Sequence, residues 1–303
     1  MQAMKPDSKP SKRSINGWIN LNKPLGLSSA QAVGKVKWLL KPQKIGHAGT
    51  LDPLATGVLP LALGEATKCV NLLVDAKKTY EFTVTLGERR STDDAEGAVV
   101  ATSEMLPTAE QIQAVLPRFT GPIQQTPPIY SAIKIDGERA YAKARAGETV
   151  AMKAREVTIH ALEFLGFHLS AQQAQFRATV SKGTYIRSLG RDIAQAAGSE
   201  GYISRLHRAA VGPFHADDAI SLDFLEESVH NAPPIQPLGA VLDDIPVQAL
   251  SSEQLQRLRH GQAIILAEPI PPAPLLAALY QGELVALTRT DGHSIIPVRL
   301  LNI

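Results

Sequence analysis

The sequence predicts a mixed α/β protein whose strands and helices follow no regular repeat. Residues 79–87 alternate apolar and polar side chains, which is typical of a half-buried strand. Two helix-starting patterns occur elsewhere, where Ser28 precedes Gln31 and Thr108 precedes Gln111 by three positions. The sequence contains neither a strict strand–helix–strand repeat nor a glycine-rich nucleotide loop. A doubly wound nucleotide-binding fold is therefore not expected.

The elements follow in order from the N-terminus. Residues 1–14 are polar and basic and predict a disordered tail. Residues 17–22 alternate apolar and polar before Lys23-Pro24, which predicts a strand and a turn. A helix is expected from Ser28 to Leu40, and another is expected between Thr108 and Gly121, after the strand at residues 79–87.

The second half of the chain contains further strands, a long helix and a proline-punctuated acidic connector over residues 216–250. The expected elements are a strand at 129–135 with a turn at 136–137, a helix at 140–146, strands at 157–169 and 175–181, a helix at 189–197, a helix at 251–259, and strands at 284–287 and 295–301.

The composition is that of an ordinary globular protein, with 303 residues and 44% hydrophobic side chains. This length allows one large domain and a small one. No apolar run approaches the roughly 20 residues that cross a bilayer, and no signal peptide begins the chain. The single cysteine, Cys69, excludes an intrachain disulfide, and its apolar surroundings predict a buried thiol. We expect a cytoplasmic monomer with no obligate protein partner.

The net charge of +2 conceals an uneven distribution. Residues 1–60 carry +7 and residues 127–215 carry +5, whereas the connector at 216–250 carries −7. Phosphate binding depends on local positive patches rather than on the total charge. The two basic segments are consistent with a nucleic-acid partner, although lysines that only cover solvated faces are the alternative explanation.

The most informative segment runs from Gly46 to Pro60 and contains one carboxylate, Asp52, among glycines, threonines and small apolar residues. Glycine permits backbone shapes that other residues avoid and proline fixes φ, so the segment predicts a rigid loop that presents Asp52. The alternative is that Asp52 caps a helix from Leu54 to Leu63, with Pro53 in its first turn. That alternative leaves the preceding Gly-His-Ala-Gly-Thr run unexplained.

This segment closely resembles the catalytic loop of the TruB family, the tRNA pseudouridine synthases that act on uridine 55 of tRNA. The match is unbroken from Gly46 to Leu59, and a broader resemblance extends from about Gly17 to Phe214. The resemblance implies a pseudouridine synthase fold, with a large mixed, mainly antiparallel sheet flanked by helices, over residues 15–246. Residues 247–303 resemble a small PUA-like β domain that binds RNA. The implied substrate is the T arm of tRNA, and no metal or organic cofactor is implied.

The resemblance assigns catalysis to three residues, Asp52, Tyr80 and Arg187. Asp52 matches the family nucleophile, and Arg187 matches the arginine that pairs with it. A nearby cation favours the charged carboxylate, which a nucleophile needs. Tyr80 matches a tyrosine credited with stacking on the base and with proton transfer, and a tyrosine offers a ring face and a polar tip for both. From pattern alone, Arg187 could form a surface ion pair and Tyr80 could be a core residue.

Five further residues are expected to bind the substrate: His47, Tyr185, Leu206, Lys23 and Asp94. His47 resembles the family histidine that fills the gap beside a flipped nucleotide, with an ordinary loop hydrogen bond as the alternative. No His or Cys spacing makes it a zinc ligand. Tyr185 and Leu206 match positions that line the pocket or contact the base, with core packing as the alternative. Asp94 either supports the site or is a turn aspartate.

One departure from the family pattern lies after residues 79–87. The family has a Thr-Asp-Thr run there, and Arg90 and Ser91 occupy its first two positions. This departure affects local contacts rather than the expected activity. Downstream, Arg205 and Arg208 flank Leu206 and its neighbour, and both are candidate phosphate contacts.

The expected function is therefore the conversion of uridine to pseudouridine in the T arm of tRNA. A guide-dependent relative inside an RNA–protein particle and an RNA chaperone on the same fold are alternatives. A carboxylate glycosidase is a third alternative, but it requires a second catalytic carboxylate, and the sequence shows no such pair clearly.

Overall fold

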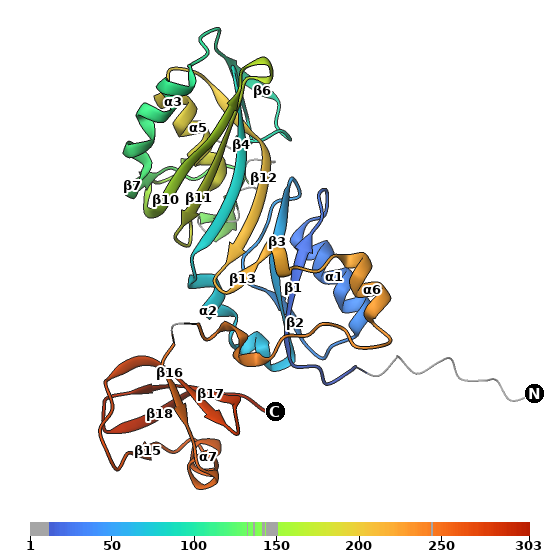
Figure 1. The fold of residues 1–303 in the computed structure, drawn as a ribbon, viewed down its shortest axis with the longest axis vertical. Coiled ribbons are helices and arrows are strands. Elements are labelled where there is room, and N and C mark those ends of the chain that lie inside the picture. The colour runs from blue at the N-terminus through green and yellow to red at the C-terminus, as the bar shows by residue number, and fades with distance from the viewer. Residues whose placement is uncertain (1–11, 132, 136, 141–142, 144–150, 244) are drawn as a thin grey trace, which may run out of the picture.

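Two sheets, one large and one small, organise the chain, and Figure 1 shows them in this computed structural model with the large sheet above the small one. The structure describes residues 12–131, 133–135, 137–140, 143, 151–243 and 245–303. The predicted tail at residues 1–14 lies outside the described residues except for its last three positions.

The large sheet has nine strands in the part of the chain that the structure describes. Neighbouring strands pair antiparallel throughout, except that β3 and β12 pair parallel. The mixed, mainly antiparallel sheet is thus confirmed. In order across the sheet, the strands are β1 (Gly17–Lys23), β3 (Ala55–Leu63), β12 (Gly201–Val211), β4 (Lys78–Leu86), β11 (Gln173–Val180), β10 (Arg155–His168) and β7 (Gly121–Gln125), with β2 (Ile45–His47) on β3 and β13 (Phe214–His215) on β12.

Helices flank this sheet at several places (Figure 1). Helix α5 approaches the sheet closely because Gly190 has no side chain: a Cβ there would lie 2.5 Å from Ile203 on β12. The capping boxes predicted at Ser28 and Thr108 are confirmed at the starts of α1 and α3. The helices are α1 (Ser29–Leu40), α2 (Val70–Asp75), α3 (Ala109–Val115), α5 (Ile186–Ala196) and α6 (Leu222–Ser228).

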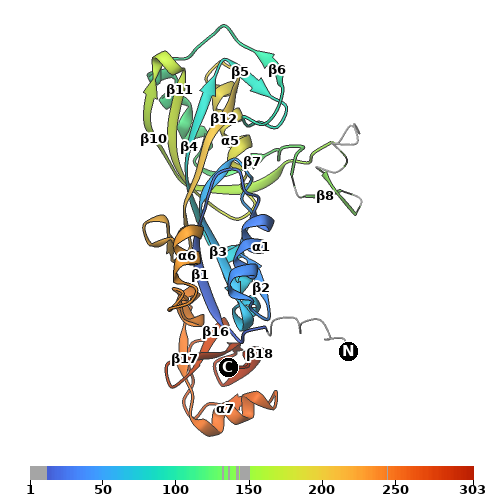
Figure 2. The same cartoon turned by 90° about the vertical axis from the view of Figure 1, so that its right-hand side faces the viewer.

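Two hairpins lie outside the large sheet: β5 (Glu88–Arg90) pairs with β6 (Val99–Thr102), and β8 (Lys134–Ile135) pairs with β9 (Glu138–Arg139). Figure 2 shows the β8–β9 hairpin and α1 projecting to the same side of the molecule. The strand expected over residues 129–135 is therefore reduced to its last two residues. The helix expected at 140–146 lies mostly outside the described residues.

The small C-terminal β domain is present, and its first strand begins at Val247. It pairs antiparallel except for the parallel pair of β14 and β16. The sheet order in the described chain is β14 (Val247–Ala249), β16 (Ala273–Tyr280), β17 (Glu283–Thr290), β18 (Ser294–Leu300) and β15 (Ile264–Ile265), with helix α7 (Ser252–Arg259) after β14.

The C-terminal β domain shares a buried apolar cluster with the large sheet. Trp18 of β1 and Phe214 of β13 belong to the same cluster as Leu284 and Leu287 of β17. Two hydrogen bonds also join the two parts. The Lys68 ammonium donates to the Leu300 carbonyl at 2.8 Å, and the Asn302 amide donates to the Glu65 carboxylate at 2.7 Å. The two parts are therefore packed together rather than only linked.

The helix alternative for Leu54 to Leu63 is wrong, because these residues form the turn after Asp52 and strand β3. Strand β3 is buried on both sides between β1 and β12, which explains its continuous apolar sequence. Asp52 therefore lies in a loop between two paired strands, as the motif predicted.

Candidate active site

The loop that carries Asp52 is fastened to the start of helix α1. The Ser29 hydroxyl accepts from the Leu51 amide at 2.8 Å and donates to the Leu51 carbonyl at 3.0 Å. The Leu51 side chain is buried in the main core. Gly49 has φ +91°, a left-handed conformation that favours glycine. These contacts place Asp52 at a defined position, with its side chain 38% exposed.

Arg187 binds Asp52 directly. Its Nε lies 3.0 Å from Oδ2 of Asp52, and its own side chain is only 8% exposed. Arg187 lies in the first turn of α5, so the ion pair joins the catalytic-loop candidate to a helix far along the chain. The pair that the sequence predicted is thus present. One member is buried and the other reaches the surface, so the carboxylate remains accessible to a substrate.

The remaining nitrogens of Arg187 are also occupied. Nη1 lies 3.5 Å from Oδ2 of Asp94 and donates to the Thr92 carbonyl at 3.0 Å. Nη2 donates to the Tyr130 carbonyl at 3.0 Å. Asp94 is almost fully buried and also accepts from the Thr92 hydroxyl at 2.5 Å. This network fixes the guanidinium plane, so that its Nε faces Asp52.

Arg90, which departs from the family pattern, supports the turn that contains Asp94. Its guanidinium carbon lies 4.4 Å from the ring centroid of Tyr202, and its Nη1 donates to the carbonyl of Ala95 at 3.2 Å. Arg90 therefore holds this turn through one hydrogen bond and through stacking on Tyr202.

Lys23 is completely buried beneath the loop. Its ammonium donates to the carbonyls of Leu27 at 2.6 Å, Pro24 at 2.9 Å and Pro53 at 3.5 Å. Burial lowers the pKa of Lys23 to about 8, and the Asp52 charge opposes this shift. Its substrate-binding role stays a prediction. The contacts present are with backbone carbonyls, two in the segment between β1 and α1 and one, that of Pro53, in the Asp52 loop.

Tyr80 and Leu206 lie on adjacent central strands. Tyr80 of β4 is half-buried and stands opposite Arg208 of β12 in the register. Leu206 pairs in register with Ala55, the first residue of β3 after the Asp52 loop. Leu206 is 6% exposed and belongs to the main core, as the core alternative for it required. Contact with the base by either residue stays a prediction.

His47 is the last residue of β2, and Tyr185 directly precedes α5. His47 ends β2 and is half-buried, and its Nδ1 is buried without a hydrogen-bond partner among the described residues. Burial lowers the pKa of His47, and the Arg208 charge adds to this effect. Tyr185 precedes α5, and its backbone N–H and C=O both bond to the Gln125 side chain, at 2.8 and 3.1 Å.

Two residues, Gln125 and Arg208, hold this site in roles that the sequence did not predict. Gln125 is buried and pins the start of α5 through Tyr185. Arg208 was expected to contact phosphate, and this expectation is wrong because the residue is 1% exposed and binds backbone carbonyls. The sequence gives no signal for either role, because Gln125 and Arg208 both bind backbone atoms rather than side chains.

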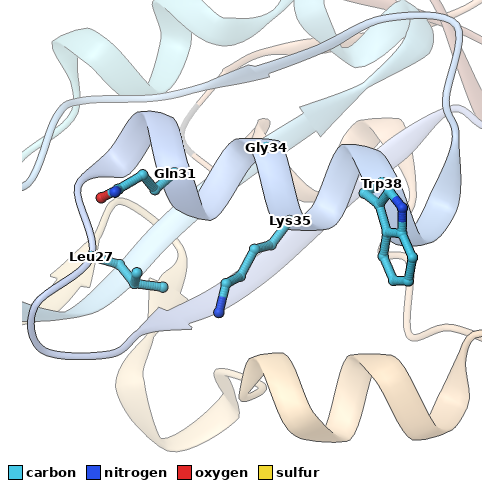
Figure 3. Close-up of a pocket in the computed structure, with 5 residues that line it drawn as sticks. All are labelled: Leu27, Gln31, Gly34, Lys35 and Trp38. Carbon is cyan, nitrogen blue, oxygen red and sulfur yellow. The ribbon is translucent and has the colours of Figure 1, made fainter.

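A shallow hollow runs along α1 and is lined by Leu27, Gln31, Gly34, Lys35 and Trp38 (Figure 3). The Trp38 side chain is 71% exposed.

Within the residues described, no three His, Cys, Asp or Glu side chains are placed to hold a metal. In the same residues, every helix is too short or too polar to span a membrane.

Comparison with known proteins gives consistent matches. A family model for the N-terminal domain of TruB family pseudouridylate synthases matches residues 37–186. The tRNA pseudouridine synthase B of Bradyrhizobium diazoefficiens is 46% identical over 96% of this chain and 87% of its own. The enzyme of the same name from Sinorhizobium medicae is 47% identical, over 96% of this chain and 97% of its own.

Solved structures agree with these matches. An H/ACA ribonucleoprotein bound to a substrate RNA containing 2′-deoxyuridine contains a similar chain, with a TM-score of 0.73 and 26% identity, over 95% of this chain and 85% of that one. A chain of a Cbf5–Nop10–Gar1 complex is also similar, with a TM-score of 0.72 and 28% identity, over 94% of this chain and 84% of that one. Together, the fold and these similarities define a pseudouridine synthase, an isomerase. More closely, the chain belongs to the TruB family.

Proposed function

We propose that this enzyme converts the uridine at position 55, in the T arm of tRNA, to pseudouridine, with Asp52 as the nucleophile. The observation that carries the proposal is the ion pair between Asp52 and Arg187 at 3.0 Å, in a loop that leaves the carboxylate accessible. The relatives named tRNA pseudouridine synthase B, 45 to 47% identical across almost the whole chain, support tRNA as the substrate.

The reaction exchanges one bond for another within the same nucleotide. The bond between uracil N1 and ribose C1′ breaks, the base rotates, and a bond from C5 to C1′ forms while the C5 proton moves to solvent and N1 gains one. Asp52 acts on the ribose while Arg187 holds its carboxylate in position through the ion pair. Tyr80 supports the base with its ring, and its hydroxyl relays the C5 proton to solvent by accepting it while releasing its own proton.

The other predicted residues prepare the substrate. The target uridine leaves the helical stack at a cost of a few kcal/mol, and His47 fills the vacancy. Leu206 and Tyr185 line the pocket that holds the detached base. Lys23 holds the backbone of the Asp52 loop, and Asp94 holds the guanidinium of Arg187. Neither a metal nor an organic cofactor enters any of these steps.

The rest of the chain provides affinity for tRNA. Residues 15–246 form the catalytic domain, and residues 247–303 act as a PUA-like RNA-binding domain after it. The exposed lysines of α1, with Lys35 and Trp38 along its hollow, extend the basic surface away from the Asp52 loop. The enzyme works as a cytoplasmic monomer without an obligate protein partner.

The Asp52→Asn variant tests the proposal, because the amide keeps the shape of the side chain and removes its charge. We expect no pseudouridine in tRNA incubated with the purified variant, and tRNA binding within about threefold of the wild type. Mass-spectrometric mapping of wild-type product should find pseudouridine at position 55. Turnover by the Asn variant would exclude Asp52 as the nucleophile, and a need for an added guide RNA would favour the guide-dependent alternative.

A further inference from the structure

Arg208 of β12 joins the two ends of the Asp52 loop from behind. Its Nε donates to the Val58 carbonyl at 2.7 Å, its Nη2 to the Gly49 carbonyl at 3.0 Å, and its Nη1 to the Thr50 carbonyl at 3.4 Å. Gly49 and Thr50 come before Asp52 in the loop, whereas Val58 follows it on β3. One side chain therefore connects the backbone on both sides of the candidate nucleophile.

The backbone of Arg208 is itself held against β3. Arg208 is the register partner of Gly57 in the parallel pair of β12 and β3. Gly57 has φ +101°, and a Cβ there would lie 2.3 Å from the Arg208 carbonyl oxygen, so only glycine allows this approach. At the other end, a Cβ on Gly49 would touch the guanidinium at 3.4 Å. Gly57 thus lets the backbone of Arg208 approach β3, and Gly49 leaves room for its guanidinium.

The charge of Arg208 has no carboxylate partner among the residues that the structure describes, although Arg187 and Arg191 in the same region both pair with aspartates. A buried cation is costly to desolvate, and an apolar residue would fill the same space at less cost. A lysine can also reach several carbonyls, as Lys23 does, but only from a single nitrogen. An arginine supplies a planar fork in which separate nitrogens donate in fixed directions, and an apolar residue supplies no donor. The hydrogen bonds of Arg208 therefore indicate that this side chain fixes the position of the loop backbone rather than only filling space.

We propose that Arg208 is a positioning residue for the reaction: by binding the carbonyls of Gly49, Thr50 and Val58, it sets the position of the loop so that Asp52 meets both Arg187 and the substrate. This inference rests on the proposed role of Asp52 as nucleophile. Arg208 touches neither substrate nor reacting atoms, so it acts through the loop alone.

The test compares Arg208→Lys with Arg208→Met. The lysine keeps the charge but lacks the fork, and the methionine loses both. Arg177→Met is the matched control, because Arg177 is an exposed arginine of the same sheet that pairs with Glu81 at 2.7 Å. For each variant, the single-turnover rate of pseudouridine formation at saturating enzyme, the dissociation constant for tRNA and the unfolding temperature are measured.

We expect Arg208→Lys to lower the single-turnover rate roughly 10²-fold, because small misplacements of a reacting group cost about this much. Its dissociation constant for tRNA should stay within about threefold of the wild type, and Arg177→Met should change neither quantity. Hydrogen exchange of residues 46–52 should increase in Arg208→Lys, while exchange in α5 and β4 stays as in the wild type.

A spectroscopic readout separates charge from geometry. The charge of Arg208 and burial both lower the pKa of His47, and the Gly49 backbone opposes them. The pKa of His47, followed by NMR with His47→Gln for assignment, should rise in Arg208→Met and change less in Arg208→Lys. The rate should nevertheless fall in both variants.

Two outcomes would overturn the positioning role. One is a near-normal single-turnover rate in folded Arg208→Lys. The other is a rate that falls only in proportion to the fraction of unfolded protein, which would make Arg208 a purely structural residue. If Arg208→Met does not fold, the lysine variant and its hydrogen exchange decide. Asp52→Asn, measured in parallel, shows separately whether the nucleophile assignment holds.

Discussion

Each nitrogen of the Arg187 guanidinium has a different partner, and this explains why arginine rather than lysine occupies the position. Nε takes the exposed carboxylate of Asp52, while the other two nitrogens bind Asp94 and the carbonyls of Thr92 and Tyr130. A lysine could satisfy Asp52 or Asp94, but its single ammonium lacks the planar fork that holds both in fixed directions. The guanidinium thereby presents its Nε to Asp52 and its Nη1 to Asp94.

Tyr80→Phe is predicted to separate stacking from proton transfer at the residue scale. Tyr80 is half-buried and packs against the main core, so phenylalanine preserves its contacts and removes only the hydroxyl. We expect tRNA affinity to stay near normal while the single-turnover rate falls on the order of 10² to 10⁴-fold, the range for general acid–base groups. Single-turnover assays and tRNA titrations measure the two effects.

Tyr80→Leu serves as the comparison, because it also removes the ring and should weaken the placement of the base. A near-normal rate for the phenylalanine variant would show that the hydroxyl has no catalytic task. Tyr80 would then be a stacking or core residue, which its partial burial also fits.

Among the elements, the junction of β3 and β12 depends most strongly on a single glycine. Gly57→Ala is predicted to destabilise the protein by roughly 2–4 kcal/mol, because it adds a Cβ against the backbone of Arg208 and strains a positive φ. Gly34→Ala on α1 is the control, since a Cβ there meets nothing within 4 Å. It should stabilise the protein by about 0.5–1 kcal/mol. Urea unfolding measures both, and equal effects would contradict the assignment.

Lys78 gives strand β4 and helix α2 a pH-dependent connection. Its buried ammonium donates to the carbonyls of Leu73, Val74 and Ala76 at the end of α2, and burial lowers the pKa of Lys78 from 10.5 to about 8. Between these values the unfolded chain binds more protons than the folded one, so stability from this group rises with pH.

We therefore predict that Lys78→Met removes about 2 kcal/mol of the increase in unfolding free energy between pH 8 and 10. Lys37→Met, a change at an exposed lysine of α1, should leave the pH profile unchanged. Urea unfolding at several pH values checks this. Parallel profiles for the wild type and Lys78→Met would show that Lys78 keeps an ordinary proton affinity in the fold.

Local sequence signals predicted those elements whose cause is local. The sequences of β1 and β4 alternate apolar and polar residues, and α1 and α3 begin with the predicted capping boxes. Strand β3 is apolar on both faces, so periodicity could not separate it from a helix. Strand β12 contains bulges between Ile203 and Arg205 and between Arg208 and Ala210, which interrupt its alternation.

The contacts of the site were also predictable only in part. The motif around Asp52 and the run ending at Arg187 predicted the ion pair, because both partners are recognisable side chains. The contacts of Gln125 and Arg208 were not predictable, because backbone carbonyls and amides carry no sequence identity. Their roles depend on the strand register, which forms only when the whole sheet is assembled.

At the scale of the whole molecule, Cys69 reports whether the two sheets stay together. The thiol is fully buried in the apolar cluster that they share, and burial raises the pKa of Cys69 to about 11. We predict that a thiol reagent at pH 8 labels the native protein only through rare opening of this cluster. Leu284→Ala, which removes about 2–5 kcal/mol of packing there, should raise the labelling rate at least tenfold.

Val298→Ala is the matched control for this experiment, because Val298 lies in the same C-terminal β domain but is 57% exposed. Its labelling rate should equal that of the wild type. Rapid labelling of the unmodified protein, or equal rates for both variants, would mean that the shared cluster does not hold the sheets together.

The parallel pairing of β3 with β12 also determines how this chain is completed during its synthesis. Val58 and Arg208 are 150 positions apart, so at about 5–20 residues per second the ribosome needs roughly 8–30 s to deliver the partner. During that interval one edge of β3 has unpaired backbone groups, the feature that promotes misassembly with other chains. The Asp52 loop therefore emerges early, whereas the arginine that binds the carbonyls on both sides of it is delivered much later.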